Sequence, residues 1–144
     1  MLQHSFPNLS EHERYTLMQA ADFSTYRAGE TVVTEGDLVE SLMIVAVGML
    51  RVTHNLDGRL SEFVGPLGPG AVVGEMSFVD GKPASATLIA DGDTEVLSIP
   101  HGAVNNLMEN DPTFAGRFYK DLFLHLAQRL RATNIRAGTA AQIQ

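Results

Sequence analysis

Between residues 23 and 99 the chain is a series of short runs of strand-favouring residues, separated by glycine, proline, asparagine and aspartate. The runs include ETVVTEGD, LMIVAVG and TEVLSIP. Seven or eight strands at this close spacing predict a barrel or a jelly roll. Two segments, Asn55–Gly58 (NLDG) and Ala90–Asp93 (ADGD), contain residues that tolerate positive φ, so we predict a hairpin turn at each.

Helical patterns flank this β-rich segment. Ser10 and Glu13 have the spacing of a capping box, which predicts a helix over about 11–21. The helical period returns at 101–110 and again from Pro112, a residue favoured at the first position of a helix. We therefore expect a mainly β fold with flanking helices: a double-stranded β-helix (jelly roll), an N-terminal helix and a two-helix C-terminal segment.

The length fits one domain. A chain of 144 residues can bury a single core but is too short for two ordinary domains. Within it we expect an N-terminal helical segment at 1–22, the barrel at 23–99, the C-terminal helices at 100–134 and a flexible tail at 135–144.

The last predicted helix, from Pro112 to about Thr133, has a wide apolar face. Its apolar residues recur every four positions, at Phe114, Phe118, Leu122, Leu126 and Leu130, with Tyr119 and Phe123 beside them. This face either packs wholly on the barrel or meets a second copy of the chain in its distal half. We predict a homodimer through the side formed by Phe118, Leu122, Leu126 and Leu130.

Composition argues against several classes of function. Ten Lys and Arg against seventeen Asp and Glu give a formal charge of −7, which disfavours binding to nucleic acid because such binding relies on cations. No run of about 18 apolar residues could cross a membrane, and the start has no signal-peptide pattern, so we expect a cytoplasmic protein. The absence of cysteine excludes disulfides and thiolate metal sites.

Motifs for catalysis or metal binding are absent. A metal-binding barrel needs about three histidines and a carboxylate that converge inside it. The five histidines have no paired ligand spacing such as HxH, and only His54 falls in a predicted strand. There is also no G-x-S-x-G or Walker motif. We expect neither an enzyme nor a metal cofactor.

The segment Gly74–Thr87, GEMSFVDGKPASAT, has the features of a phosphate-binding turn. Gly74 allows the backbone to approach a ligand, and a short helical turn after it presents N–H groups that favour an anion. Glu75 can accept a hydrogen bond from a sugar hydroxyl. We expect the strand residues from Ala84 onward to lie across the bound group. These features predict a site for a phosphate next to a ribose.

The segment resembles the phosphate-binding cassette of the cyclic-nucleotide-binding domain, found in catabolite-activator regulators, in regulatory subunits of cAMP-dependent kinase and in gated channels. Its pattern is roughly Gly-Glu-(Leu/Met)-(Ala/Ser)-(Leu/Phe), then Pro-Arg-(Ala/Ser/Thr)-Ala-(Thr/Ser). YRAGETVVTEGD, LMIVAVGMLRV and LGPGAVVGE are also similar to the family, so the resemblance covers about residues 10–133. It implies ligand-binding residues at Val73, Gly74, Glu75, Met76, Ser77, Lys82, Pro83, Ala84, Ser85, Ala86 and Thr87.

The sequence departs from this pattern at Ala84, where the family has the arginine that grips the phosphate. Hydrogen bonds to a charged group contribute about 1.5–3 kcal/mol each, so the loss would weaken binding roughly tenfold to a few hundredfold. Lys82 is a nearby cation that can return a point charge. A hydroxyl at Thr87 can favour cGMP over cAMP in the family. The site then holds a weak or altered cyclic nucleotide, a different small ligand, or none.

The resemblance implies a regulatory module in which a ligand repositions the C-terminal helix. Only ten residues follow Asn134, so no DNA-binding helix-turn-helix follows it in this chain. We therefore expect either a separate effector protein or a longer chain to which this segment belongs. The alternative is an interaction or scaffold domain that keeps the fold without a ligand.

Overall fold

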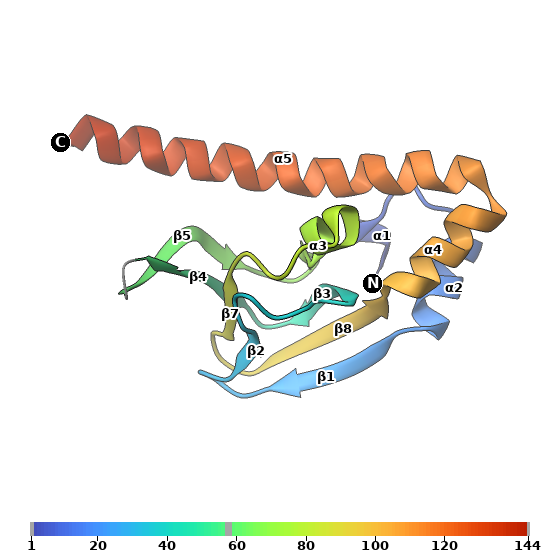
Figure 1. Ribbon diagram of the computed structural model, residues 1–144, viewed down its shortest axis with the longest axis horizontal. Helices are drawn as coiled ribbons and strands as arrows, with labels where there is room; N and C mark the ends of the chain where they lie inside the picture. Colours follow the sequence, from blue (N-terminus) through green and yellow to red (C-terminus); the bar gives the residue numbers. More distant parts are fainter. Residues whose placement is uncertain (1, 57–58, 144) are drawn as a thin grey trace.

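A computed structural model of the protein describes residues 2–56 and 59–143 and contains two four-stranded antiparallel sheets (Figure 1). The first has the order β1 (Asp22–Tyr26), β8 (Thr94–Pro100), β3 (Ser41–Val47), β6 (Val72–Val73). The second has the order β2 (Thr31–Val33), β7 (Thr87–Ala90), β4 (Leu50–Leu56), β5 (Arg59–Leu67). All strand pairs within the two sheets are antiparallel, and the predicted jelly roll is confirmed.

Helices precede, interrupt and follow the barrel. They are α1 (Leu2–Ser5), α2 (Glu11–Gln19), α3 (Glu75–Asp80), α4 (His101–Asn110) and α5 (Pro112–Ile143). The capping box of α2 is present: Ser10 Oγ accepts from the Glu13 amide at 3.1 Å, and Glu13 Oε1 accepts from the Ser10 amide at 2.8 Å. The N-terminal helix and the two C-terminal helices are therefore where the sequence predicts them. No helix in the described ranges is long and apolar enough to cross a membrane.

The last helix is longer than predicted. We expected it to end near residue 133 and a flexible tail to occupy 135–144, whereas α5 continues to Ile143. The apolar period does fade after Leu130, but a helix ends at breaking residues rather than where its apolar face ends. No proline follows Pro112, and the last residues include helix-favouring alanines.

The two predicted hairpins have different outcomes. Strands β4 and β5 do pair as a hairpin, with Leu56 opposite Arg59, although residues 57–58 of the predicted turn lie outside the described residues. The Ala90–Asp93 prediction is wrong, because this segment links β7 in one sheet to β8 in the other. Gly92 does have a positive φ, of 94°. Turn residues permit the chain to reverse, but the packing of the two sheets decides which strands pair.

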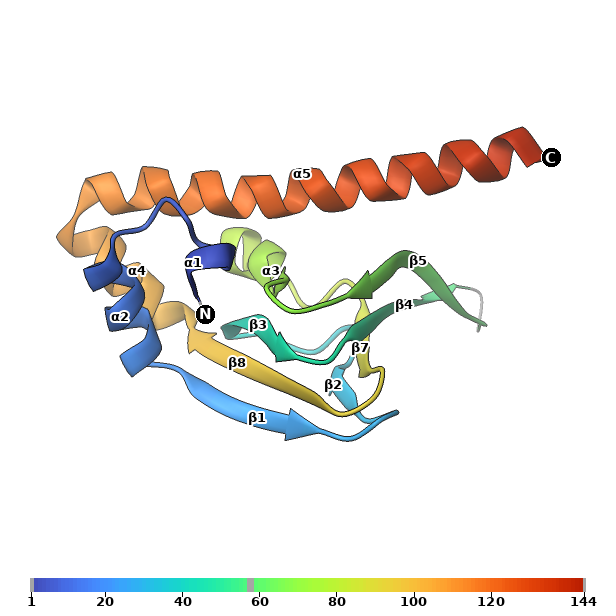
Figure 2. The ribbon, with the colours of Figure 1, turned by 180° about the vertical axis from the view of Figure 1, so that it is seen from behind.

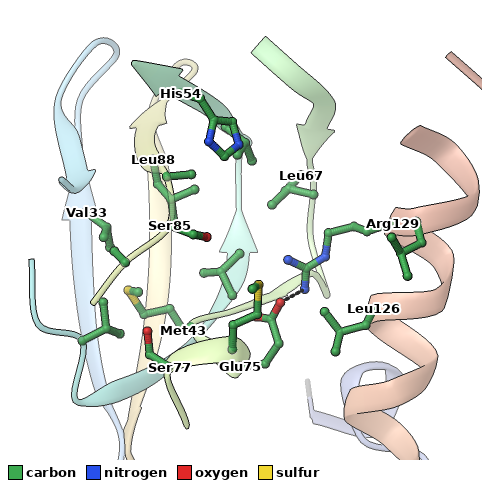
Figure 3. A pocket seen from close by; sticks show the side chains of 18 residues that line it. Val33, Met43, His54, Leu67, Glu75, Ser77, Ser85, Leu88, Leu126 and Arg129 are labelled. Atoms are coloured by element: carbon green, nitrogen blue, oxygen red, sulfur yellow. Dashed lines mark ion pairs between the residues drawn. The ribbon is translucent and has the colours of Figure 1, made fainter. Parts of the chain in front are cut away.

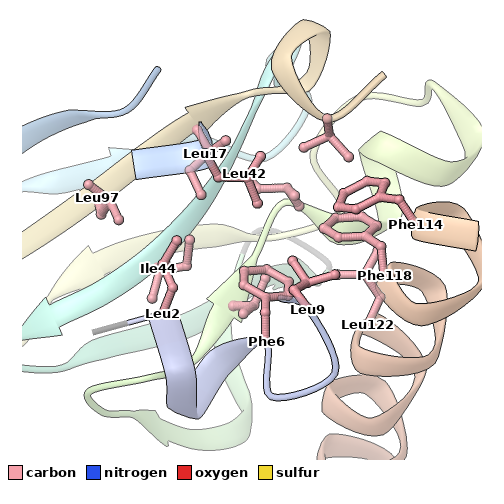
Figure 4. Packing of buried hydrophobic residues seen from close by; sticks show 13 residues of the cluster. Leu2, Phe6, Leu9, Leu17, Leu42, Ile44, Leu97, Phe114, Phe118 and Leu122 are labelled. Atoms are coloured by element: carbon pink, nitrogen blue, oxygen red, sulfur yellow. The ribbon is translucent and has the colours of Figure 1, made fainter. Parts of the chain in front are cut away.

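Buried apolar side chains form two clusters, and β3 contributes to both. Met43 and Val45 face the barrel interior, part of which is the cavity in Figure 3. Leu42 and Ile44 face the opposite side, where they belong to the cluster that includes Phe114 and other helix residues (Figure 4). Successive side chains of a strand point to opposite faces, so a strand covered on both sides is apolar throughout.

The predicted dimer face on α5 is wrong in part. Phe118 and Leu122 are 0% and 2% exposed because they pack in the helix-side cluster. The exposed large apolar side chains of α5 are instead Tyr119 (44%), Phe123 (69%), Leu124 (44%) and Leu130 (62%). An α-helix turns about 100° per residue, so a row repeating every four residues drifts by about 40° at each step. Such a row cannot present all of its members to one partner.

Polar contacts fix the first half of α5 to the N-terminal segment, which lies at the end of the barrel where α5 begins (Figure 2). The carboxylate of Asp121, fully buried, accepts from the Asn8 amide at 3.1 Å and from Asn8 Nδ2 at 2.5 Å. Arg117 donates to both carboxylate oxygens of Glu13 in α2. His125 Nε2 lies 2.6 Å from the carbonyl oxygen of Ser5. These contacts hold the first half of α5 against the N-terminal segment.

Candidate functional site

A cavity of about 440 Å³ lies between the barrel, α3 and α5 (Figure 3). Eight of the residues predicted for the ligand line it: Val73, Gly74, Glu75, Met76, Ser77, Ala84, Ser85 and Ala86. Pockets of this size are typical of sites for small molecules. The fold therefore brings most of the predicted site together around one space.

Three predicted residues do not line this cavity. Lys82 and Pro83 are exposed, and the Lys82 amide donates to Asp80 Oδ1 at 2.9 Å. The hydroxyl of Thr87 accepts a hydrogen bond from the Glu35 amide at 2.9 Å. The geometry thus gives no support to a replacement charge from Lys82 or to a preference for cGMP through Thr87.

Gly74 is required at the start of α3. Its φ is +86°, and a Cβ atom at this position would lie 2.7 Å from the carbonyl oxygen of Ser41. Only glycine adopts this conformation at low cost and also leaves room for the neighbouring strand. The turn that follows begins α3, as the sequence predicts, and Glu75 is its first residue.

The segment around Ala84 is not yet a strand, contrary to the prediction, because β7 begins only at Thr87. The Ala84 amide donates to the Asp37 carbonyl at 2.8 Å, and its carbonyl accepts from the Gly36 amide at 2.9 Å. Both backbone groups of Ala84 are therefore used within the fold. Its side chain, which lines the cavity, is a methyl group and brings no charge.

The cavity does contain a cation, and it comes from α5. Arg129 Nη2 lies 2.8 Å from Glu75 Oε1 and also donates to the Val72 carbonyl. Glu75 is 2% exposed, and its second oxygen, Oε2, has no hydrogen-bond partner among the described residues. A buried carboxylate oxygen without a donor is costly. The arrangement therefore offers an acceptor to a ligand that carries a hydroxyl or N–H group.

Arg129 was not predicted as a site residue, because the ligand contacts were taken from the cassette alone. A signal was available in the spacing. Leu126, Arg129 and Leu130 stand at positions i, i+3 and i+4, so they share one face of the helix, and all three line the cavity. A cation within an apolar row of a helix is a better candidate for a site than a cation at a frayed end.

The rest of the lining is mostly apolar, from strands of both sheets and from α5. The walls that sequence reasoning missed are Val33, Val39, Met43, Val52, Leu67, Leu88, Leu126 and Leu130. His54 is the remaining polar residue of the lining that was not predicted as a site residue. Walls of this kind suit a ligand that is mostly apolar and has a few polar groups at its edges.

Aromatic contacts link the cassette to both C-terminal helices. The Phe78 ring of α3 lies 5.2 Å from His101 of α4, 5.6 Å from Phe118 and 6.2 Å from Tyr119 of α5, between ring centroids. Burial lowers the pKa of His101 below its ordinary value of 6.5. Because the Phe78 ring contacts both helices, a displacement of α3 would be transmitted directly to α4 and α5.

Metal ligands do not gather in the part of the chain that the structure describes. No group of three or more His, Cys, Asp or Glu side chains there could hold a metal ion.

Comparison with known proteins identifies this arrangement. Residues 23–111 match the profile of the cyclic nucleotide-binding domain. The "Cyclic AMP receptor protein" of Thermus thermophilus is 33% identical over 110 residues, which cover 76% of this chain and 49% of that protein. "Lysophospholipase nte1" of Aspergillus terreus is 31% identical over 113 residues, 78% of this chain but 7% of that protein. The chain thus spans about half the length of the first relative and a small part of the second.

Solved structures agree with this result. The crystal structure of the Thermus thermophilus catabolite activator protein has a TM-score of 0.75 at 29% identity, covering 96% of this chain and 63% of that one. The regulatory domain of Toxoplasma gondii PKA with cAMP has a TM-score of 0.67 at 26% identity, covering 72% and 39%. A Methylobacillus flagellatus domain has the same fold, with a TM-score of 0.82 at 23% identity, covering 94% and 81%. The chain belongs to the cyclic nucleotide-binding domain family.

Proposed function

We propose that this chain is a regulatory domain that binds cAMP, cGMP or a related small anionic ligand between its cassette and α5, and that it signals through α5. The observation that carries the proposal is the contact between Glu75 of the cassette and Arg129 of α5 inside the cavity. The family relationship supports a nucleotide, since one neighbour is described as a PKA regulatory domain with cAMP.

Arg129 replaces the cation missing at Ala84. A guanidinium group can hold two phosphate oxygens with paired hydrogen bonds. Glu75 Oε2 is buried and has no partner among the described residues, so it can accept from a ribose hydroxyl. The bound ligand would then contact the cassette and α5 at once, and its arrival would change the Glu75–Arg129 contact that connects them.

This placement of the cation has a consequence for signalling. An arginine within the cassette would hold the phosphate without involving the C-terminal helix. Because Arg129 lies on α5, a single interaction couples the binding of the anion to the position of the helix. A ligand that binds better to one position of α5 therefore increases the fraction of molecules with the helix in that position. Asp121 and Arg117 hold the first half of α5 to the N-terminal segment, so we expect the largest displacement in the helix beyond them.

We further propose a regulatory rather than a catalytic role, and a homodimer that forms through the exposed side of α5. Tyr119, Phe123 and Leu130 supply the apolar side chains of that face, in place of the buried Phe118 and Leu122. A separate effector protein and a cytoplasmic location stay predictions from the sequence.

A thermal-shift assay followed by calorimetry with cAMP and cGMP tests ligand binding. A ligand that binds only the folded protein raises its stability by RT ln(1 + [L]/Kd), about 2.7 kcal/mol at one hundred times Kd. We expect Arg129→Gln combined with Glu75→Gln, which removes both charges together, to weaken binding at least tenfold. Arg131→Gln is the matched control, since Arg131 is exposed and does not line the cavity.

The scaffold alternative makes the opposite prediction. Ala84 favours it, because the cassette has lost the residue that grips phosphate in the family. Under this alternative, neither nucleotide at millimolar concentration shifts the melting temperature of the wild-type protein. That result would overturn the proposed ligand site, as would equal affinities in the double variant and the wild type.

A further inference from the structure

Strand β4 places a polar side chain on the face that looks into the barrel. Leu50 and Val52, which are 0% and 8% exposed, point into the interior, and His54 continues the same alternation. His54 is half-buried and lines the cavity.

His54 lies at the end of the cavity away from α3. Figure 3 shows its ring at one end and Glu75 and Ser77 at the other, with the apolar side chains of Leu88 and Leu67 along the walls between them. The cavity is therefore polar at both ends and mostly apolar between them, where Ser85 is the labelled polar side chain. Such a site suits a flat apolar ring system that has polar groups at both of its ends.

A cyclic nucleotide that lies between the two ends of the cavity would have one orientation. Its phosphate and ribose belong at the Glu75–Arg129 end, where the charged groups are. The base then extends between the apolar walls, and the edge of the base remote from the sugar faces His54. No other polar side chain of the described lining lies at that end in Figure 3.

We infer that His54 is a specificity-determining residue, which hydrogen-bonds the 6-position of a purine whose phosphate is held at the Glu75–Arg129 end. The inference rests on the proposed function, because it takes the direction of the ligand from it. A neutral imidazole has one N–H donor and one acceptor nitrogen. It can donate to the carbonyl of guanine or accept from the amino group of adenine. His54 therefore selects for a 6-substituted purine and discriminates little between cAMP and cGMP.

The test compares three ligands by calorimetry: cAMP, cGMP and purine riboside 3′,5′-cyclic phosphate, which lacks the 6-substituent. The wild type and Ala84→Arg are both measured, since the added arginine increases the affinity without touching the far end of the cavity. We expect the unsubstituted purine to bind about tenfold more weakly than cAMP, the value of one buried hydrogen bond. The two natural nucleotides should differ less than tenfold.

Variants of His54 test whether this side chain causes the difference in affinity between cAMP and the unsubstituted purine. In His54→Leu, we expect cAMP and the unsubstituted purine to bind within about twofold of each other. In His54→Gln, whose amide is both donor and acceptor, we expect most of the tenfold difference to return. His12→Leu is the control for a histidine replaced on the surface, because His12 is exposed in α2. Thermal unfolding of each variant shows whether the domain is folded.

Two outcomes overturn the inference, and they are distinguishable. If a folded His54→Leu still prefers cAMP tenfold, His54 does not read the base, and the proposed nucleotide site stands without it. If neither the wild type nor Ala84→Arg binds any of the three ligands, the proposed nucleotide function fails and the role of His54 fails with it.

Discussion

The ion pair between Glu13 and Arg117 joins α2 to the first half of α5, and its loss has a calculable effect on stability. The pKa of Glu13 is lowered from its ordinary value of 4.5 to about 2, chiefly by the hydrogen bonds from Arg117 and also by those from Ser10, against the opposing effect of burial. We expect Glu13→Gln to remove the charge yet keep the capping box, because glutamine also serves at that position.

The magnitude follows from the linkage between protonation and folding. A fall in pKa from 4.5 to about 2 corresponds to about 3 kcal/mol of stabilisation of the folded carboxylate. Arg117 has a side chain that is 35% exposed, so solvent screening reduces this figure to about 2 kcal/mol. The folded pKa lies below the unfolded one, so the stabilisation is complete above about pH 5. It is lost as the pH falls from 4.5 toward 2.

Urea denaturation of the wild type and Glu13→Gln at pH 7, 4.5, 3 and 2 measures this effect. The variant should be less stable by about 2 kcal/mol at pH 7, and the difference should shrink to a few tenths of a kcal/mol near pH 2. Glu11→Gln, an exposed carboxylate in the same helical turn, is the control and should change stability by less than about 0.5 kcal/mol. A difference between wild type and Glu13→Gln that stays constant from pH 7 to pH 2 would refute the ion-pair argument.

Other predictions concern the cassette and the assembly. Ala84→Arg should tighten cAMP or cGMP binding at least about tenfold in calorimetry, and Glu75→Ala in that background should weaken it again; a folded Ala84→Arg that binds neither nucleotide would show divergence at more than one residue. Gly74→Ala should lower the unfolding free energy by about 2 kcal/mol or more in urea, because its new Cβ would meet a backbone oxygen at 2.7 Å; a stability change under 0.5 kcal/mol would contradict this. Phe123→Ser should shift sedimentation at tens of micromolar from dimer toward monomer, whereas Tyr15→Ser, an exposed aromatic on α2, should not; a monomeric wild type would dispose of the dimer.

Features that depend on neighbouring residues in the chain were predictable from the sequence. The capping box of α2 needs only Ser10 and Glu13, and both of its hydrogen bonds are present. The cassette is also local, since Gly74 and the turn of α3 lie within one contiguous segment. The change from strand spacing to helical spacing after Pro100 likewise located the C-terminal helices. Backbone conformation and periodicity set these features, and both can be derived from a single stretch of residues.

The pairing of distant segments was decided only by the tertiary structure. Strands β7 and β8 follow one another in the chain but lie in different sheets, which no turn residue specifies. Arg129 and His54 reach the same cavity as Glu75 from α5 and from β4. The spacing around Arg129 marks it as a candidate site residue but does not say which residues it meets, because that depends on how the whole barrel closes and how α5 crosses it. One contiguous segment of residues therefore sets the shape of the turn after Gly74, whereas the packing of α5 places Arg129 beside it.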